Sequence, residues 1–400
     1  MDNKELKNEY MKYCSEFHNK LDKILITAIE YEESLNLIIY IIDKYIYSNE
    51  HILNYLHIYK NRKPLKKKEI YNIQEINKCI NNKTPLICAT RRMEFKIVKY
   101  LIEHGADVNA VDKNKKTALM YACRFCTNNE IIKYLVEHGA DINAKSEIKE
   151  TSLMYACQFC TNNEVIKYLV EHGADINAKS EIKETSLMYA CQFCTNNEVL
   201  KYLVEHGADV NARTESMKTP LMYACRFYKN NEVIKYLVEH GADINAKSES
   251  KETSLMFACC YCINNEVIKY LVEHGADVNA MNIDEETPLI YICNRNNNPD
   301  MSEEENFDSS EHKILNIKII KYLIEQGADT NAKNKDKETP LVYACRDYKD
   351  IELIKYLIEH GAVVDTKNTF NETPLMLACR DCINFEIIKY LVEHGADVNA

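Results

Sequence analysis

Five Cys-x-x-Cys pairs recur along the chain, and this is the spacing that zinc sites and dithiol redox sites use. The pairs are Cys123/Cys126, Cys157/Cys160, Cys191/Cys194, Cys259/Cys262 and Cys379/Cys382. Zinc needs four ligands around one ion, with sulfurs roughly 4 Å apart, whereas successive pairs are separated by a packed helix, on the order of 10 Å. We therefore predict that the pairs bind no metal, and we expect no cofactor elsewhere. Each first cysteine is instead expected to be a small buried apolar residue.

The seventeen cysteines are expected to be reduced thiols, because their number is odd and the N-terminus lacks the apolar core of a secretory signal. The longest charge-free apolar run near the N-terminus, residues 34–42, is far shorter than the ~20 residues that a membrane span needs. The sequence therefore predicts a cytoplasmic protein without membrane contact. The basic stretch at residues 60–68, KNRKPLKKK, is interpreted as a solvated linker, with a nuclear-localisation signal as the alternative.

Histidines also recur, one before each of eight glycines that end a predicted helix. They are His104, His138, His172, His206, His240, His274, His360 and His394. A histidine at this place interacts favourably with the negative end of the helix dipole, and copies one repeat apart cannot converge on one substrate. The sequence has neither a phosphate-binding glycine loop nor a Ser or Cys nucleophile motif. We predict that the protein is not an enzyme.

Periodicity is the strongest signal in the sequence. The usual step between equivalent residues is 34, and residues 141–174 and 175–208 differ only at Ile166 against Leu200, which indicates tandem duplication. The repeated threonines are Thr84, Thr117, Thr151, Thr185, Thr219, Thr253, Thr287, Thr339 and Thr373. The repeated glycines are Gly105, Gly139, Gly173, Gly207, Gly241, Gly275, Gly327, Gly361 and Gly395.

Within one period, the pattern predicts two short helices. The Thr is expected to cap the first helix, as in TPLMYACRF, and a polar turn such as TNN supplies an Asn cap for the second helix, NEVIKYLVE. The following Gly is suited to a left-handed helix end, and a polar hairpin-like connection such as ADINAKSEIKE leads to the next unit. Because two such helices bury too little apolar surface alone, neighbouring units must stack.

These units resemble ankyrin repeats. Thr219, Pro220, Leu221 and Ala224 match the start of the T-P-L-H-x-A-A signature, and residues 239–245 match its E-x-G-A-D-x-N ending. The resemblance implies an all-α solenoid of nine repeats over residues 84–400, with hairpin-like fingers. The glycine common at the finger tip is replaced, most often by Lys, and a left-handed conformation would then cost roughly 1 kcal/mol per tip. We therefore expect these tips to adopt a different turn.

Three regions depart from the regular pattern. Residues 1–83 are predicted to form helices that pack on the first repeat as an N-terminal cap. An acidic insertion at about residues 296–316 is predicted to be a disordered loop between the two helices of the seventh unit. The last unit keeps the apolar interior pattern, so fraying or self-association through an uncapped C-terminal repeat is expected.

Net charge argues against a nucleic-acid partner. Residues 1–83 hold 14 Lys and Arg against 12 Asp and Glu, which leaves 36 against 49, or a balance of −13, for the repeats. A basic or neutral partner is therefore favoured. The resemblance implies a protein-interaction scaffold. The alternative is an adaptor for ubiquitin ligation or a pathogen-type effector, whose N-terminal helices recruit a second partner, and an enzyme confined to residues 1–83 is the least favoured hypothesis.

The resemblance also implies two sets of functional residues. Partner binding is expected on the concave and finger face, through aromatic and polar residues that follow the Ala-Cys pair and through apolar finger tips; alternatively, each ring covers its own lengthened turn. The candidates are Arg124, Phe125, Gln158, Phe159, Gln192, Phe193, Arg226, Phe227, Tyr261, Ile148, Ile182 and Phe370. Hydroxylation of a finger asparagine would fall on Asn109, Asn143, Asn177, Asn211, Asn245 and Asn279, although such an Asn normally forms hydrogen bonds within its finger.

Overall fold

The computed structural model describes residues 84–125, 129–160, 162–194, 196–227, 231–261, 265–294, 310–381 and 384–399. The chain divides into two compact units, Met1–Glu181 and Ile182–Ala400. The predicted N-terminal cap, its basic stretch and most of the acidic insertion lie outside the described residues. Within the described part, the secondary structure is helical, without strands, and no helix has the length and apolarity that a membrane crossing requires.

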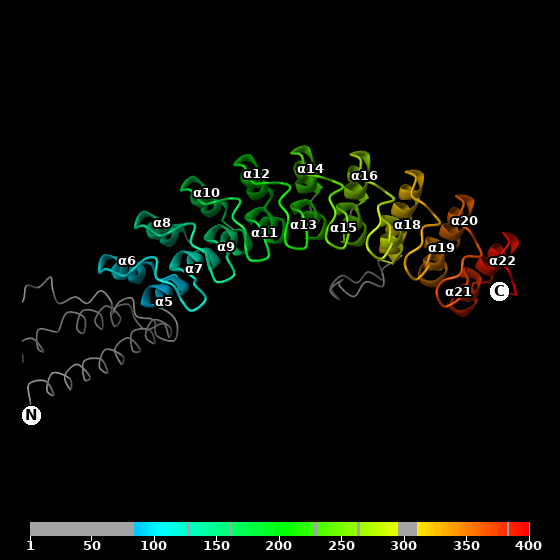
Figure 1. The fold of residues 1–400 in the computed structure, drawn as a ribbon, viewed down its shortest axis with the longest axis horizontal. Coiled ribbons are helices and arrows are strands. Elements are labelled where there is room, and N and C mark those ends of the chain that lie inside the picture. The colour runs from blue at the N-terminus through cyan, green and yellow to red at the C-terminus, as the bar shows by residue number, and fades with distance from the viewer. Residues whose placement is uncertain are drawn as a thin grey trace, which may run out of the picture. The chain divides into compact units, whose positions relative to one another are not determined.

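The described residues of the first unit, from Thr84 onward, form three helix pairs. In each pair a first helix is followed by an antiparallel second helix, and the first helices pack side by side, as do the second helices (Figure 1). The bounds are α5 Pro85–Arg91, α6 Phe95–Glu103, α7 Ala118–Arg124, α8 Asn129–Glu137, α9 Ser152–Phe159 and α10 Asn163–Glu171.

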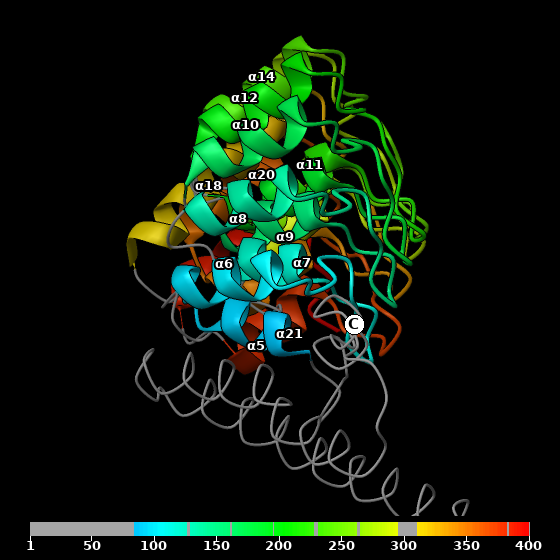
Figure 2. The ribbon, with the colours of Figure 1, turned by 90° about the vertical axis from the view of Figure 1, so that its left-hand side faces the viewer.

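The second unit repeats the same arrangement, and its fingers project to one side of the helices (Figure 2). The helices are α11 Ser186–Phe193, α12 Asn197–Glu205, α13 Pro220–Phe227, α14 Asn231–Glu239, α15 Ser254–Tyr261, α16 Asn265–Glu273, α17 Pro288–Asn294, α18 Ser310–Glu325, α19 Pro340–Tyr343, α20 Ile351–Glu359, α21 Pro374–Asp381 and α22 Phe385–Glu393. A π-helical turn, Ala344–Tyr348, continues α19. The expected all-α repeat solenoid is confirmed.

The helix boundaries arise where the sequence analysis predicts them. Thr219 Oγ1 accepts a hydrogen bond from the backbone N–H of Met222, and Asn162 Oδ1 accepts one from Glu164, so each side chain satisfies a donor at a helix start. Gly241 ends α14 with φ of 86°, a conformation that costs glycine little. The core lies between the two rows of helices in each unit, where Leu221, Ala224 and their equivalents are fully buried.

Neighbouring fingers are joined by asparagine side chains as well as by the helix core. The Asn245 amide donates to the carbonyl of Gly275 at 2.8 Å, and its Oδ1 accepts the backbone N–H of Asp277 at 2.9 Å. Asn143 makes the same two bonds to the next finger in the first unit. One side chain therefore satisfies both a donor and an acceptor of the following repeat, which fixes the spacing of the fingers.

The expectation of a different turn at the finger tips is wrong. The tip residues all keep positive φ angles between 57° and 63°: Lys115, Lys149, Lys183, Met217, Lys251, Glu285, Lys337 and Asn371. The tip of one finger shows why this is tolerated. Ser248 exchanges backbone hydrogen bonds with Lys251 and Glu252, and its hydroxyl accepts the backbone N–H of Glu252. These bonds close the turn and offset the local strain.

The predicted extent of the disordered insertion is also wrong at its C-terminal end. Residues 310–316 belong to α18, which runs without interruption to Glu325, and Asn316 is buried. Extension of an existing helix gains one hydrogen bond for each residue fixed, so the helix continues beyond the usual repeat boundary. The π-helical turn was not predicted; it places the Tyr348 hydroxyl 2.8 Å from the carbonyl of Ile292, to which it donates.

Replacement of Lys251 by glycine is expected to stabilise the protein by about 0.5 kcal/mol. Relief of the left-handed conformation contributes roughly 1 kcal/mol, and the greater freedom of glycine in the unfolded chain removes part of that gain. Lys247→Gly is the matched control, because Lys247 lies on the same finger without a positive φ and should lose stability. Chemical denaturation of both variants measures the difference; equal shifts would contradict the strain argument.

Candidate protein-binding surface

In each unit, the predicted aromatic residues lie at the C-terminal ends of the first helices. Phe125, Phe159, Phe193 and Phe227 are 38%, 41%, 42% and 39% exposed, so each ring is neither displayed in full nor buried as a plug. One face packs on the tyrosine four residues earlier, with ring centroids 6.1 Å apart for Tyr223 and Phe227. The part of each ring that neighbouring side chains leave uncovered is open to solvent. Aromatic rings held in this way lose little conformational entropy when a partner covers them.

The predicted arginines lie against the rings of the following repeat. In the first unit, the Arg124 guanidinium is 5.0 Å from the centroid of Phe159. In the second unit, Arg226 is 5.2 Å from Phe227 and 4.9 Å from Tyr261. These are cation–π distances, so each unit has an alternating surface of guanidinium and aromatic groups. Gln158 and Gln192 occupy the same position in their own repeats and are half-buried.

The apolar finger residues lie apart from the helix row, at the tips. Ile148, Ile182 and Phe370 are 46%, 51% and 77% exposed. Further exposed apolar residues on the fingers were missed: Met217, Met281 and Ile283. The signal was present in the sequence, because these residues stand within a few positions of the predicted finger tips.

A row of tyrosines on the first helices was also missed. Each hydroxyl donates to a carboxylate at the base of a finger: Tyr121 to Asp112 at 2.7 Å, Tyr223 to Glu184 at 2.6 Å and Tyr291 to Glu252 at 3.0 Å. Burial, and then the bond to Asp112, raises the pKa of Tyr121 to about 12. The hydroxyls therefore stay protonated at neutral pH and fix the carboxylates. Tyrosine recurs at the fifth place of most repeats, so periodicity alone could have indicated this row.

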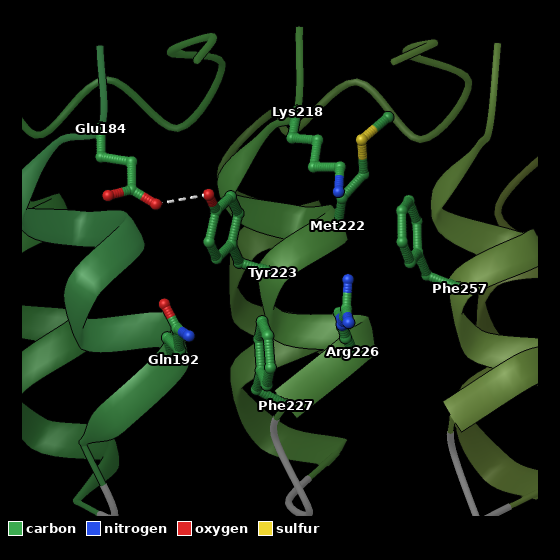
Figure 3. Close-up of a pocket in the computed structure, with 8 residues that line it drawn as sticks. All are labelled: Glu184, Gln192, Lys218, Met222, Tyr223, Arg226, Phe227 and Phe257. Atoms are coloured by element: carbon green, nitrogen blue, oxygen red, sulfur yellow. Dashed lines mark hydrogen bonds between the residues drawn. The ribbon is translucent and has the colours of Figure 1, made fainter. Parts of the chain in front are cut away.

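A pocket lies on this surface of the second unit, across three successive first helices (Figure 3). Its volume is about 190 Å³, below the range typical of sites for drug-sized ligands, so it suits one side chain. Figure 3 shows that the charged ends of Lys218 and Arg226 point into the space between the rings on α13 and Phe257 on α15. The residues that line it are Glu184, Gln192, Lys218, Met222, Tyr223, Arg226, Phe227 and Phe257.

Each repeated histidine packs on a tyrosine at the C-terminal end of its second helix. His240 Nδ1 lies 2.8 Å from the carbonyl of Tyr236, and the two rings stack with centroids 3.9 Å apart. The same pairing recurs from His104 to His394. Among the described residues, no group of three His, Cys, Asp or Glu side chains could hold a metal ion.

The cysteines that begin four of the five Cys-x-x-Cys pairs are buried in the core, whereas Cys379, which begins the fifth, is exposed, so the expectation of burial is wrong there. Cys123, Cys157, Cys191 and Cys259 are at most 1% exposed, as expected for small apolar residues. Eleven of the described cysteines are free thiols. Cys160 is an exception to the prediction of reduced thiols throughout, since it forms a disulfide. Its sequence position gave no reason to separate it from the equivalent Cys194, which is not disulfide-bonded.

Cysteine alkylation should divide the free thiols by burial. Iodoacetamide reacts with the thiolate, and burial raises the pKa of Cys123 and Cys191 far above the ordinary value, whereas Cys379 is exposed. We expect Cys379 to be labelled at least tenfold faster, as followed by peptide mass spectrometry. Because folding raises the pKa of these buried thiols, their contribution to the free energy of unfolding is fully present below about pH 9. That contribution is lost as the pH rises further, since the unfolded chain then loses the thiol protons first. Equal labelling rates in the folded protein would contradict this placement.

The six asparagines proposed for hydroxylation occupy the finger position of the predicted pattern. The side-chain amide of such an asparagine donates a hydrogen bond to a backbone carbonyl of the next repeat, as Asn109 does to Gly139 at 2.9 Å. Hydroxylation therefore stays a prediction, and it requires the finger to open. Intact mass of protein from its native host is expected to show additions of single oxygen atoms; an unmodified mass would count against it.

The last described helix pair exposes apolar side chains on its outer side. Phe385 is 74% exposed, Val392 40% and Met376 37%. Self-association through this repeat stays a prediction.

Comparison with known families agrees with the geometry described above. A family model described as ankyrin repeats, in three copies, matches residues 44–146, 145–214, 213–282 and 311–400, well over half of the chain. The first match begins inside the segment that was predicted to be an N-terminal cap, and the break between the last two matches contains most of the acidic insertion. Helix pairs, finger connections and family match agree, and the chain belongs to the ankyrin-repeat family.

Proposed function

We propose that the protein is a non-enzymatic scaffold that binds a protein partner across the first helices and the fingers. Ankyrin repeats are protein-interaction modules, typically without catalytic activity, and this supports the general class. The single observation that carries the choice of face is the row of half-exposed phenylalanines alternating with arginine or glutamine. Aromatic and Arg residues are the usual anchors of protein interfaces.

The arrangement of these groups favours an extended segment of the partner over a compact cofactor. Equivalent rings recur once per repeat on successive first helices, so a chain laid across them meets a new ring at every repeat. The excess of acidic residues over the repeats favours a partner that is basic or neutral overall. A cytoplasmic location is part of the proposal, with the nucleus as the alternative.

The alternative function is that of an adaptor for ubiquitin ligation or a pathogen-type effector, in which residues 1–83 recruit a second protein. That segment lies outside the described residues. Affinity purification with the full chain, followed by mass spectrometry, separates the two functions: recovery of ubiquitin-ligase subunits would favour the adaptor, and their absence alongside a specific partner would favour the scaffold.

Replacement of Phe159 or Phe193 by serine tests the proposed face. Because each ring is about two-fifths exposed, we expect each variant to lose roughly 1–2 kcal/mol of stability, well short of the 3–5 kcal/mol typical of a core phenylalanine. Retention of the proteins that the unaltered chain captures from a lysate should fall by about tenfold or more, as measured by quantitative mass spectrometry.

Phe385→Ser is the matched control, because it makes the same change at a more exposed ring on a second helix. Capture should be unchanged in the control. Full capture by the Phe159 and Phe193 variants, or a stability loss typical of a core residue, would show that the rings serve packing instead of binding.

A further inference from the structure

The pocket on the second unit differs from its surroundings by its charge. Its lining includes two cationic side chains, Lys218 and Arg226, against one carboxylate, Glu184, which accepts the Tyr223 hydroxyl at 2.6 Å. The repeats as a whole have a charge balance of −13. A locally positive pocket in an acidic repeat domain is therefore a feature of particular residues and does not follow from average composition.

Two later repeats of the same unit show a carboxylate that can face the arginine. In the repeat that begins at Thr339, the residue just before Thr is Glu338, and Arg346, seven residues after Thr, forms an ion pair with it at 2.5 Å. In the next repeat Arg380 forms an ion pair with Glu372 in the same relative positions. The finger base and the end of the first helix are therefore close enough for a carboxylate to reach the guanidinium within one repeat.

The pocket repeat carries lysine in place of that glutamate. Lys218 stands just before Thr219, and Arg226 stands seven residues after it, so the position of the intramolecular carboxylate is taken by a second cation. The Lys218 ammonium lies 5.5 Å from the ring centroid of Phe257, and Arg226 lies over Phe227 and Tyr261. The rings therefore lie against both cations at the pocket.

This arrangement favours a ligand group of negative charge. A cationic side chain would meet two like charges, and the ring faces that could stabilise it are already covered by Lys218 and Arg226. A carboxylate would accept hydrogen bonds from both cations, and charge-assisted bonds of this kind are about twice as strong as neutral ones. Gln192 and the Tyr223 ring border the same space.

We propose that this pocket binds an aspartate or glutamate side chain of the partner, whose carboxylate takes the place that Glu338 and Glu372 occupy in their own repeats. The proposal rests on the proposed function and adds the chemistry of one anchoring residue. The partner segment can be basic or neutral overall, since the pocket accommodates one side chain. The apolar Met222 and Phe257 at the pocket wall match the methylene groups of the entering acidic side chain.

The same combination occurs in the first unit, which is an independent occurrence within the chain. Lys116 and Arg124 stand at the equivalent positions around Thr117. Lys116 lies 5.0 Å from the ring centroid of Tyr155, and Arg124 lies 5.0 Å from that of Phe159. We expect this second site to bind the same type of side chain.

A peptide array read with the full-length protein tests the proposal. The array carries short peptides of random sequence around one fixed central residue, which is Glu, Gln, Lys or phosphoserine. We expect the Glu set to bind about tenfold more strongly than the Gln set, as one charge-assisted interaction predicts, and the Lys set to bind least. The preference for Glu should decrease as salt is raised.

The variants use residues that neighbouring repeats already contain, so folding is expected to be retained. Arg226→Gln and Arg124→Gln each install the residue found at Gln158 and Gln192, and the double variant should lose the preference for Glu over Gln. Lys218→Glu should close the pocket of the second unit by restoring the intramolecular ion pair. Lys247→Gln, an equal loss of charge at an exposed finger position, is the control and should keep the preference.

The outcomes separate this proposal from the proposed function. Equal binding of the Glu and Gln sets, with binding still lost in Phe159→Ser, would overturn the carboxylate pocket and leave the protein-binding face intact. A preference that survives in the double arginine variant would place the acid elsewhere and overturn it too. Stronger binding of phosphoserine than of Glu would change the ligand to a phosphate. No binding of any set would overturn both proposals.

Discussion

No helix pair of this protein can bury its apolar surface alone, and the rest of the structure depends on that constraint. Within each unit, first helices pack on the next first helix, and Asn side chains such as Asn245 join successive fingers. Both interactions act only between neighbours, so the stability of an array is close to a sum over repeats and their interfaces. The residues that face the adjacent repeat are therefore restricted, whereas those at the ends of the first helices are free to vary.

That separation explains how near-identical copies can carry specific function. The blocks at residues 141–174 and 175–208 are almost the same, yet the residues just before Thr and seven residues after it change from one repeat to another. Glu150 and Gln158 in one repeat become Lys218 and Arg226 two repeats later, and Glu338 and Arg346 further on. The buried Leu and Ala of these first helices stay constant. Duplication supplies the scaffold, and a few surface changes distinguish the repeats.

Much of the fold could be predicted from the sequence because its determinants are local. Thr219 caps its helix through a residue three positions away, and Gly241 ends its helix by its own conformation. The finger tips were predicted wrongly, because the cost of a left-handed Lys251 is a local quantity, whereas the hydrogen bonds of Ser248 that offset it appear only in the folded finger. The row of candidate phenylalanines was identified from position in the period, but the partial exposure of each ring depends on a tyrosine packed beside it.

The tyrosine and carboxylate contacts could not be predicted for a related reason: their partners lie in different repeats in different cases. Tyr155 donates to Glu150 at the base of its own repeat, whereas Tyr223 donates to Glu184 of the preceding repeat. Lys218 does not by itself decide this choice, because Tyr291 also donates to the preceding repeat, at Glu252, although Glu286 stands at the base of its own repeat. The change from Glu to Lys at position 218 acts instead on the charge of the surface, where it leaves a second cation in the pocket lined by Arg226. A sequence comparison of isolated repeats would detect this change of sign, but not which carboxylate each tyrosine meets.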